Sequence, residues 1–417
     1  MRTESRKVIS LIHPEEVVQL AVSLGNVASP TGEEKAVGDF LFEWLKEEGF
    51  HPFRQRVAEG RENIIARLPG KGGGKSLIFN AHMDTAVWAP HDLWLVGEEQ
   101  PDYNHAWVAD EKVCGQGVVN DKGPMAAFLI AAKALRESGI PLRGDVLLTL
   151  VVGEIGQAPI DEYQGARYLG KGLGARHLVD HGVFADCALV AEATDFGLTW
   201  AECGALYIKI TTRGRRIYTP YVKRPHRAEE SPSALVQMAK LILALEDWAL
   251  QYEEKRVLPI EVGEIRPRAA VGAIRSGVPF HPSNTPAICS SYLDVRLLPG
   301  ADPNPIVEEL RALARKVGVG AEFEVYLFRP GYIGKNIEHL RGALETAHQE
   351  VFGTKLGGVS PPVTSMWRDV NIFNAVGIPS ITYGPGGGAG EGTSYVKVED
   401  LVHASKVYAL TALFACG

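Results

Sequence analysis

Three short apolar runs, with helical patterns between them, mark the first half of the chain. The runs span residues 76–80, 145–152 and 186–191. Between the first two, residues 124–138 repeat Ala, Leu and Ile on one side of a helical period. Strands that are apolar on both faces and alternate with helices are typical of a parallel sheet covered by helices. The sequence therefore predicts an α/β fold on a mixed, mostly parallel sheet.

From residue 205 the pattern changes to alternating strands and amphipathic helices, and from residue 329 the first pattern resumes. This order predicts an α+β domain of residues 205–328 inserted into a domain of residues 1–204 and 329–417, and 417 residues are enough for two cores. The expected elements of the inserted domain are strands at 207–212, within 258–274, at 287–297 and at 322–328, and helices at 233–250 and 305–317.

Charge and composition exclude several classes of function. A net charge of −7 and a pI near 6.0 argue against nucleic acid as a partner, because phosphate binding needs clustered positive charge. No apolar run has the length of a membrane span, and the N-terminal residues lack the apolar core of a signal peptide. The five cysteines are scattered and form no CxxC pair, as expected of reduced thiols. We expect a cytoplasmic protein with no membrane partner.

Polar residues follow the three apolar strands at the point where each strand ends. His82 and Asp84 follow the first strand, Glu154 the second and Glu192 the third. In open parallel sheets, ligands bind at the carboxyl ends of the strands. For any single acidic residue a solvated loop position is the better explanation, but four residues at equivalent positions favour a shared site. A histidine with carboxylates predicts a divalent metal ion, zinc or manganese.

The same positions carry a resemblance to a known family. Residues 82–84 (HMD) resemble the HxD motif of the dinuclear metallohydrolases that include carboxypeptidase G, acetylornithine deacetylase, succinyl-diaminopimelate desuccinylase and aminoacylase. Residues 115–123, 153–156 and 191–194 resemble their next three motifs, and residues 384–386 the turn before the last one. The resemblance runs through nearly the whole chain. It implies that residues 205–328 are the family's lid and dimerisation domain.

The departures from the family pattern remove the ligands specific to one of the family's two metal ions. The resemblance implies that the first ion is held by His82, Asn120 and Glu192, with Asn120 where the family has a bridging Asp. At the two positions specific to the second ion, this chain has Ile155 and, by alignment, Gly390. The resemblance therefore predicts one divalent ion, because both ligands specific to the second ion are missing.

Two retained acids have roles by the same resemblance. Glu154 falls on the position of the general base, which takes a proton from the attacking water. Asp84 falls on the position that orients His82 and fixes its tautomer.

Three further residues are candidates for contact with the substrate. Tyr218 and Asn284 lie in the inserted domain where the family has residues that stabilise a developing oxyanion. A Tyr that packs on the lid and an Asn that caps a turn are comparable explanations. Arg368 could bind a substrate carboxylate with two hydrogen bonds, or pair with an Asp to brace a loop.

Together these features predict a hydrolase of a C–N bond in a small carboxylate-bearing substrate, with one divalent ion and a Glu general base. A lid of this type implies a homodimer or a higher homo-oligomer. Two alternatives stay open. One is hydrolysis of an aryl amine, as in a nitroanthranilate aminohydrolase that resembles the same family. The other is a catalytically silent binding protein.

Overall fold

The chain folds into two compact units. The computed structural model describes residues 2–86, 105–115, 117–261, 263–388 and 394–417. Unit 1 comprises Met1–Trp200, Ile333–Ser360 and Arg368–Gly417, and unit 2 comprises Ala201–Tyr332 and Pro361–Trp367. Among the described helices, no single one is long and apolar enough to cross a membrane. The bent pair Thr3–Ile9 and Pro14–Gly25 meets that test only when the two are taken together.

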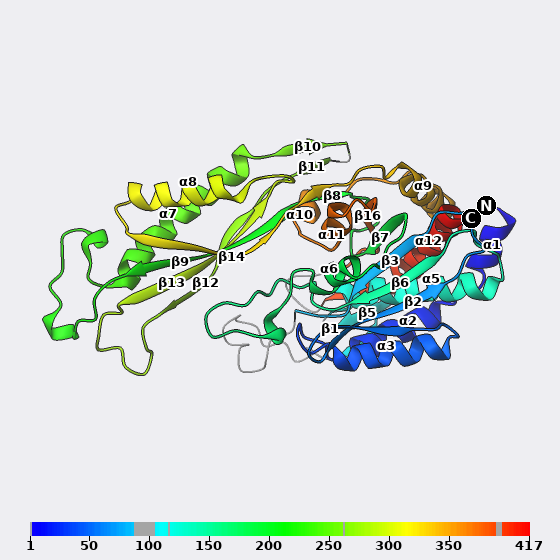
Figure 1. The fold of residues 1–417 in the computed structure, drawn as a ribbon, viewed down its shortest axis with the longest axis horizontal. Coiled ribbons are helices and arrows are strands. Elements are labelled where there is room, and N and C mark those ends of the chain that lie inside the picture. The colour runs from blue at the N-terminus through cyan, green and yellow to red at the C-terminus, as the bar shows by residue number, and fades with distance from the viewer. Residues whose placement is uncertain (1, 87–104, 116, 262, 389–393) are drawn as a thin grey trace. The chain divides into compact units, whose positions relative to one another are not determined.

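Unit 1 is built on a six-stranded sheet in the order β1-β2-β6-β3-β7-β16 (Figure 1). The strands β6, β3, β7 and β16 run parallel, and β1 and β2 join their edge in antiparallel pairing. The predicted mixed, mostly parallel sheet is therefore confirmed. The strand bounds are β1 Phe53–Ala58, β2 Arg61–Leu68, β3 Leu77–His82, β6 Val146–Val151, β7 Cys187–Ala191 and β16 Ser380–Tyr383.

The continuous apolar runs of the sequence are the central strands of this sheet. Every residue of β3 and of β7 is buried. Two helices cover one face, because the Phe79 ring of β3 lies 5.7 Å from Phe128 of α5 and 5.8 Å from Tyr408 of α12. The helices of unit 1 are α1 Thr3–Ile9, α2 Pro14–Gly25, α3 Lys35–Glu47, α5 Gly123–Ser138, α6 Leu173–Asp180, α9 Glu338–Phe352, α11 Val370–Ala375 and α12 Val398–Cys416.

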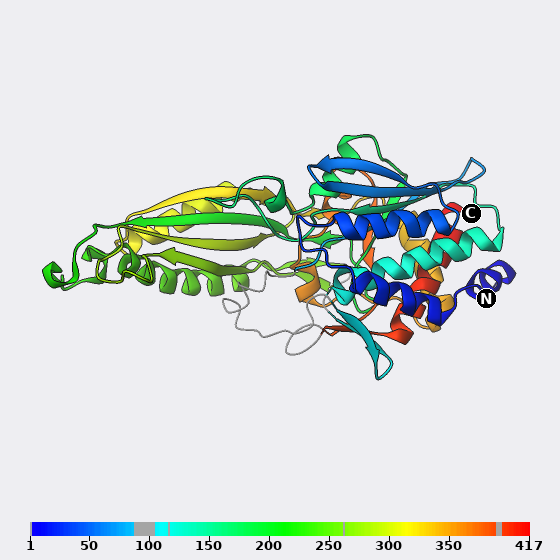
Figure 2. The ribbon, with the colours of Figure 1, turned by 90° about the horizontal axis from the view of Figure 1, so that it is seen from below.

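Unit 2 is an antiparallel sheet covered on one side by two helices (Figure 2). Its strand order is β12-β13-β9-β14, and its core is formed by side chains of the sheet and of both helices. The predicted α+β order is present, with a short pair of strands and a short helix in addition. The bounds are β9 Gly204–Arg213, α7 Ala234–Lys255, β10 Leu258–Ile260, β11 Gly263–Ile265, β12 Ala269–Ser276, β13 Ile288–Leu297, α8 Pro303–Lys316, β14 Ala321–Arg329 and α10 Pro361–Thr364.

Most of the elements that the sequence did not predict are short or polar; the exception is β2, which has eight residues and a largely buried centre. Strand β1 (FRQRVA) has no buried residue, so it lacks an apolar signal. Helix α6 has eight residues. A small sheet, β17-β5-β4, is made of strands of three or four residues: β4 Ala106–Ala109, β5 Lys112–Gly115 and β17 Tyr395–Lys397. Two-residue strands also pair as β8 Ala201–Glu202 and β15 Tyr332–Ile333.

Candidate metal centre

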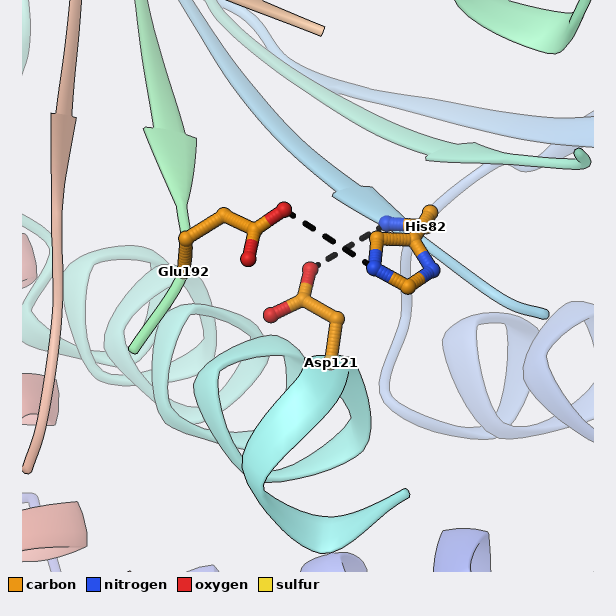
Figure 3. Close-up of side chains that lie close together, drawn as sticks. All are labelled: His82, Asp121 and Glu192. Carbon is orange, nitrogen blue, oxygen red and sulfur yellow. Dashed lines mark hydrogen bonds and ion pairs between the residues drawn. The ribbon is translucent and has the colours of Figure 1, made fainter. Parts of the chain in front are cut away.

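Three buried side chains meet beyond the carboxyl ends of the parallel strands (Figure 3). His82 is the last residue of β3, and Glu192 directly follows β7. Asp121 comes from the π-helical turn Val118–Lys122 that leads into α5. Each offers a ligand atom, and these atoms all lie within 4.8 Å of one another. This is the one such group among the described residues, so it is the candidate site for a metal ion.

The imidazole of His82 is held so that one ring nitrogen faces the cluster. Its Nδ1 lies 2.9 Å from the backbone carbonyl of Asp84, which favours the tautomer protonated at Nδ1. Its Nε2 lies 2.8 Å from Asn120 Oδ1 and 3.8 Å from Glu192 Oε1. An Nε2 lone pair among oxygen atoms is suited to bind a cation.

Asp121 is a site residue that sequence reasoning missed. The motif comparison assigned the position of the family's bridging Asp to Asn120, and the structure brings the Asn120 side-chain oxygen to His82 Nε2. The next residue, Asp121, also turns its carboxylate into the cluster, where Oδ2 accepts the backbone N–H of His82 at 3.2 Å. The available signal was the acid beside Asn120 in residues 115–123.

Asp84 joins the end of β3 to the segment that carries Glu154. Its Oδ1 accepts the backbone N–H of Glu154 at 3.0 Å, and its Oδ2 accepts that of Ile155 at 3.0 Å and the Thr31 hydroxyl at 2.8 Å. Burial alone raises the pKa of Asp84, but its bonds to His82 and Thr31 lower that pKa to about 2. Asp84 is therefore a fixed carboxylate, with Oδ1 3.4 Å from His82 Nδ1.

Three buried carboxylate oxygens of the centre have no hydrogen-bond partner among the described residues. They are Asp121 Oδ1, Glu154 Oε1 and Asp369 Oδ1. Glu154 Oε2 lies 3.9 Å from His82 Nε2, so Glu154 borders the candidate metal ligands. A buried oxygen without a donor costs free energy, and a cation among such oxygens removes that cost. The residues present therefore fit a divalent ion.

The pKa values of the side chains in the centre reflect burial and the closeness of several carboxyl groups. Burial, followed by repulsion from Glu192, raises the pKa of Asp121 well above its ordinary value. Burial also raises the pKa of Glu154, which the charge of Lys171 opposes. For His82, burial lowers the pKa, but the hydrogen bond and charge of Asp84 outweigh burial and raise it well above its ordinary value. The centre therefore favours bound positive charge, either protons or a metal ion.

Arg368 lies inside this cluster. Its Nε is 3.2 Å from Glu192 Oε2, and both residues are buried. The adjacent Asp369, which the sequence did not single out, is buried and accepts a hydrogen bond from Asn80 Nδ2 at 3.1 Å. Burial and repulsion from Glu154 raise the pKa of Asp369 well above its ordinary value. Arg368 is thus next to a candidate metal ligand.

Tyr218 and Asn284 face each other within unit 2. They form an isolated antiparallel bridge, flanked by a hydrogen bond from the Thr219 N–H to the Ser283 carbonyl at 2.9 Å. Tyr218 is 53% exposed. Their role as oxyanion donors stays a prediction. Two residues stand at the positions specific to the second ion. Gly390 lies outside the described residues, and the backbone N–H of Ile155 donates a hydrogen bond to Asp84 Oδ2.

Comparisons with known proteins agree with the motifs. N-formyl-4-amino-5-aminomethyl-2-methylpyrimidine deformylase of Bacillus subtilis is 25% identical over 429 aligned positions, covering 95% of this chain and 93% of that protein. Carboxypeptidase G2 of Pseudomonas sp. is 27% identical over 238 positions, 54% of this chain and 50% of that protein. The crystal structure of YxeP of Bacillus subtilis, a dinuclear metal binding peptidase, matches with a TM-score of 0.60 at 15% identity, covering 97% of this chain and 98% of that one.

The resemblance predicted from the motifs is confirmed over most of the chain. The model of peptidase family M20/M25/M40 matches residues 78–413, which span both units. The chain therefore belongs to peptidase family M20/M25/M40 and is a metallohydrolase that acts on C–N bonds.

Proposed function

We propose that this protein hydrolyses an amide bond in a small carboxylate-bearing substrate with one divalent ion, zinc or manganese. One observation carries the proposal. His82, Asp121 and Glu192 form the one group of potential metal ligands among the described residues. In this proposal the three hold the ion, and Asn120 Oδ1, 2.8 Å from His82 Nε2, is a fourth ligand atom.

In the proposed hydrolysis, the ion and the side chains around it have separate roles. A divalent ion supplies a Lewis acid that polarises the scissile carbonyl and lowers the pKa of water. Glu154 takes the proton from the attacking water and returns it to the leaving amine. Its backbone N–H is bonded to Asp84 Oδ1 at 3.0 Å, so the base and His82 are positioned by the same carboxylate. Tyr218 and Asn284 donate hydrogen bonds to the developing oxyanion.

The substrate class follows from the charge of the site and from the relatives. Arg368, whose Nε lies 3.2 Å from Glu192 Oε2, would bind the substrate carboxylate. One relative, matched over 95% of this chain, is a deformylase of an N-formyl aminopyrimidine. Short N-acyl groups, with formyl first, are therefore the first substrates to test.

Unit 2 would join two copies of the chain. Large apolar side chains are exposed on helix α7, where Leu243 is 71% and Leu250 60% exposed, and on strand β12, where Ile274 is 47% exposed. Strand β12 is an edge strand of its sheet and can pair with another strand. We propose a homodimer through this unit and a cytoplasmic location, which the five free cysteines support. Light scattering on Leu243→Glu tests the dimer.

Metal analysis joined to a substrate panel tests the function. The purified chain is loaded with Zn²⁺ or Mn²⁺, its bound metal is counted, and it is assayed on N-formyl, N-acetyl and N-succinyl amines and on aryl amines. One ion per chain with turnover of an N-acyl amine supports the proposal. Two ions contradict the single-ion centre. Release of ammonia from an aryl amine alone indicates an aminohydrolase, and no bound ion indicates a silent binding protein.

A further inference from the structure

The centre holds more carboxyl groups than one divalent ion can balance in their ionised form. Five carboxylates surround His82, and each of these residues is at most 5% exposed: Asp84, Asp121, Glu154, Glu192 and Asp369. Buried charges are stable only when they are paired, protonated or bound to a cation. Two other buried residues next to these carboxylates are cationic. Arg368, 4% exposed, contacts Glu192. Lys171, 5% exposed, is bonded through its backbone to the residue after Glu154, and its charge acts on Glu154.

Lys171 is fixed against the segment that carries Glu154. Its backbone N–H donates to the Ile155 carbonyl at 3.1 Å, and the next residue, Gly172, donates to the Gly153 carbonyl at 2.9 Å. The contact is between backbones, since a Cβ at Gly170 would lie 2.3 Å from the Ile155 carbonyl oxygen. Lys171 also has a φ of 48°, in the left-handed region that costs free energy for a residue with a side chain.

Arg368 is fixed on the other side of the cluster, against a candidate metal ligand. Its Nε lies 3.2 Å from Glu192 Oε2, on the same carboxylate whose Oε1 lies 3.8 Å from His82 Nε2. One carboxylate thus faces a fixed cation with one oxygen and the candidate metal position with the other. Lys122, a further buried lysine, donates its Nζ to the Val27 carbonyl at 2.6 Å and is bonded outside the carboxylate cluster.

We propose that Lys171 and Arg368 supply the positive charge of a second divalent ion and so restrict this centre to one. Together the two side chains carry the charge of one dication. Arg368 lies 3.2 Å from Glu192, and the backbone of residues 171–172 is bonded to the residues on either side of Glu154. This inference rests on the proposed one-ion function. It explains why carboxylates remain around His82 although the chain has Ile155 where the resemblance expects a ligand of the second ion.

Charge removal at each residue should strengthen metal binding. A unit positive charge in a buried site opposes a divalent cation, so Lys171→Met and Arg368→Met should each lower the Kd for Mn²⁺ by about tenfold or more. The double variant should take up a second ion at saturating Mn²⁺. Lys171→Arg keeps the charge and should keep the wild-type Kd. Lys133→Met is a matched control, because Lys133 pairs with Glu16 and Glu48, which lie outside the cluster.

The experiment uses the full-length chain after removal of metal with a chelator. The Kd for Mn²⁺ is measured by competition with a fluorescent chelator, and bound metal per chain is counted after dialysis. Circular dichroism selects the folded variants. Lys171→Gln replaces Lys171→Met if the latter does not fold, and Arg368→Met tests the proposal independently.

Failure of this inference is separable from failure of the proposed function. One outcome overturns only the role of Lys171 and Arg368 and leaves the one-ion function standing. In it, wild-type protein binds one ion, and the charge-removing variants have the same Kd and ion count as Lys171→Arg. Wild-type protein with no ion or two ions overturns the one-ion function, and the inference with it. Tighter binding confined to the charge-removing variants supports both.

Discussion

Replacement of Arg61 by Met should strongly destabilise unit 1. Arg61 is fully buried at the start of β2 and donates through Nε to Glu34 Oε2 at 2.8 Å and through Nη2 to Glu34 Oε1. Its Nη1 donates to the carbonyls of Ala166 and Leu169, at 2.8 and 2.5 Å. These carbonyls belong to the loop that leads to Lys171. One side chain therefore supports both a buried carboxylate and the loop next to the metal centre.

The magnitude follows from what the substitution leaves behind. Loss of one partner of a buried ion pair costs about 3–5 kcal/mol, because the remaining charge stays buried without compensation. Two carbonyls also lose a donor, and each costs about 1 kcal/mol or more when it stays buried. Arg54→Met is the matched control. Arg54 is 29% exposed and pairs with Asp39 and Glu62, and such a pair contributes about 0–1 kcal/mol.

The stability lost in Arg61→Met should depend on pH. Burial raises the pKa of Glu34 even with Arg61 present, and removal of the guanidinium raises it further. A carboxyl whose pKa is raised by folding is favoured in its protonated form. Its penalty is therefore absent at low pH and grows as pH rises through the folded-state pKa. The destabilisation by Arg61→Met should be smaller near pH 5 than near pH 8.

Chemical denaturation followed by circular dichroism measures this effect at both pH values. The double variant Arg61→Met/Glu34→Leu removes both charges and should recover part of the loss, since apolar replacement of a whole buried pair is close to neutral. A loss below about 1 kcal/mol for Arg61→Met, or an equal loss at both pH values, would refute the reasoning.

Four further predictions concern the metal centre. His82→Ala and Glu192→Ala should each abolish stoichiometric metal binding, and retained metal would contradict their assignment as ligands. Glu154→Gln should keep the ion and lower kcat by about 10²- to 10⁴-fold, so near-normal turnover excludes it as the base. Because the pKa of Asp121 is raised well above its ordinary value, metal affinity should fall as pH decreases and proton release should accompany binding, which calorimetry in two buffers measures. Tyr218→Phe should lower kcat without changing metal affinity, and an unchanged kcat identifies packing as its role.

The sequence by itself determined the secondary structure of both units where periodicity was strong. The runs that became β3, β6 and β7 are buried on nearly every residue, so their composition alone predicted a sheet covered on both faces. Likewise, the repeated Ala, Leu and Ile predicted the helix α5 with one buried side, and the structure buries nearly all of its residues. The position of His82, Glu154 and Glu192 followed from these strands, because side chains at the carboxyl ends of parallel strands share one edge.

Only the tertiary structure decided which charges meet around His82. Asp121 enters the cluster through the local path of a π-helical turn, which a linear motif does not specify. Arg368 reaches Glu192, and Lys171 reaches the Glu154 segment, through contacts between residues distant in sequence and through backbone angles that residue type does not predict. Charge balance in a buried site depends on distance and burial together, and these exist only after the chain has folded.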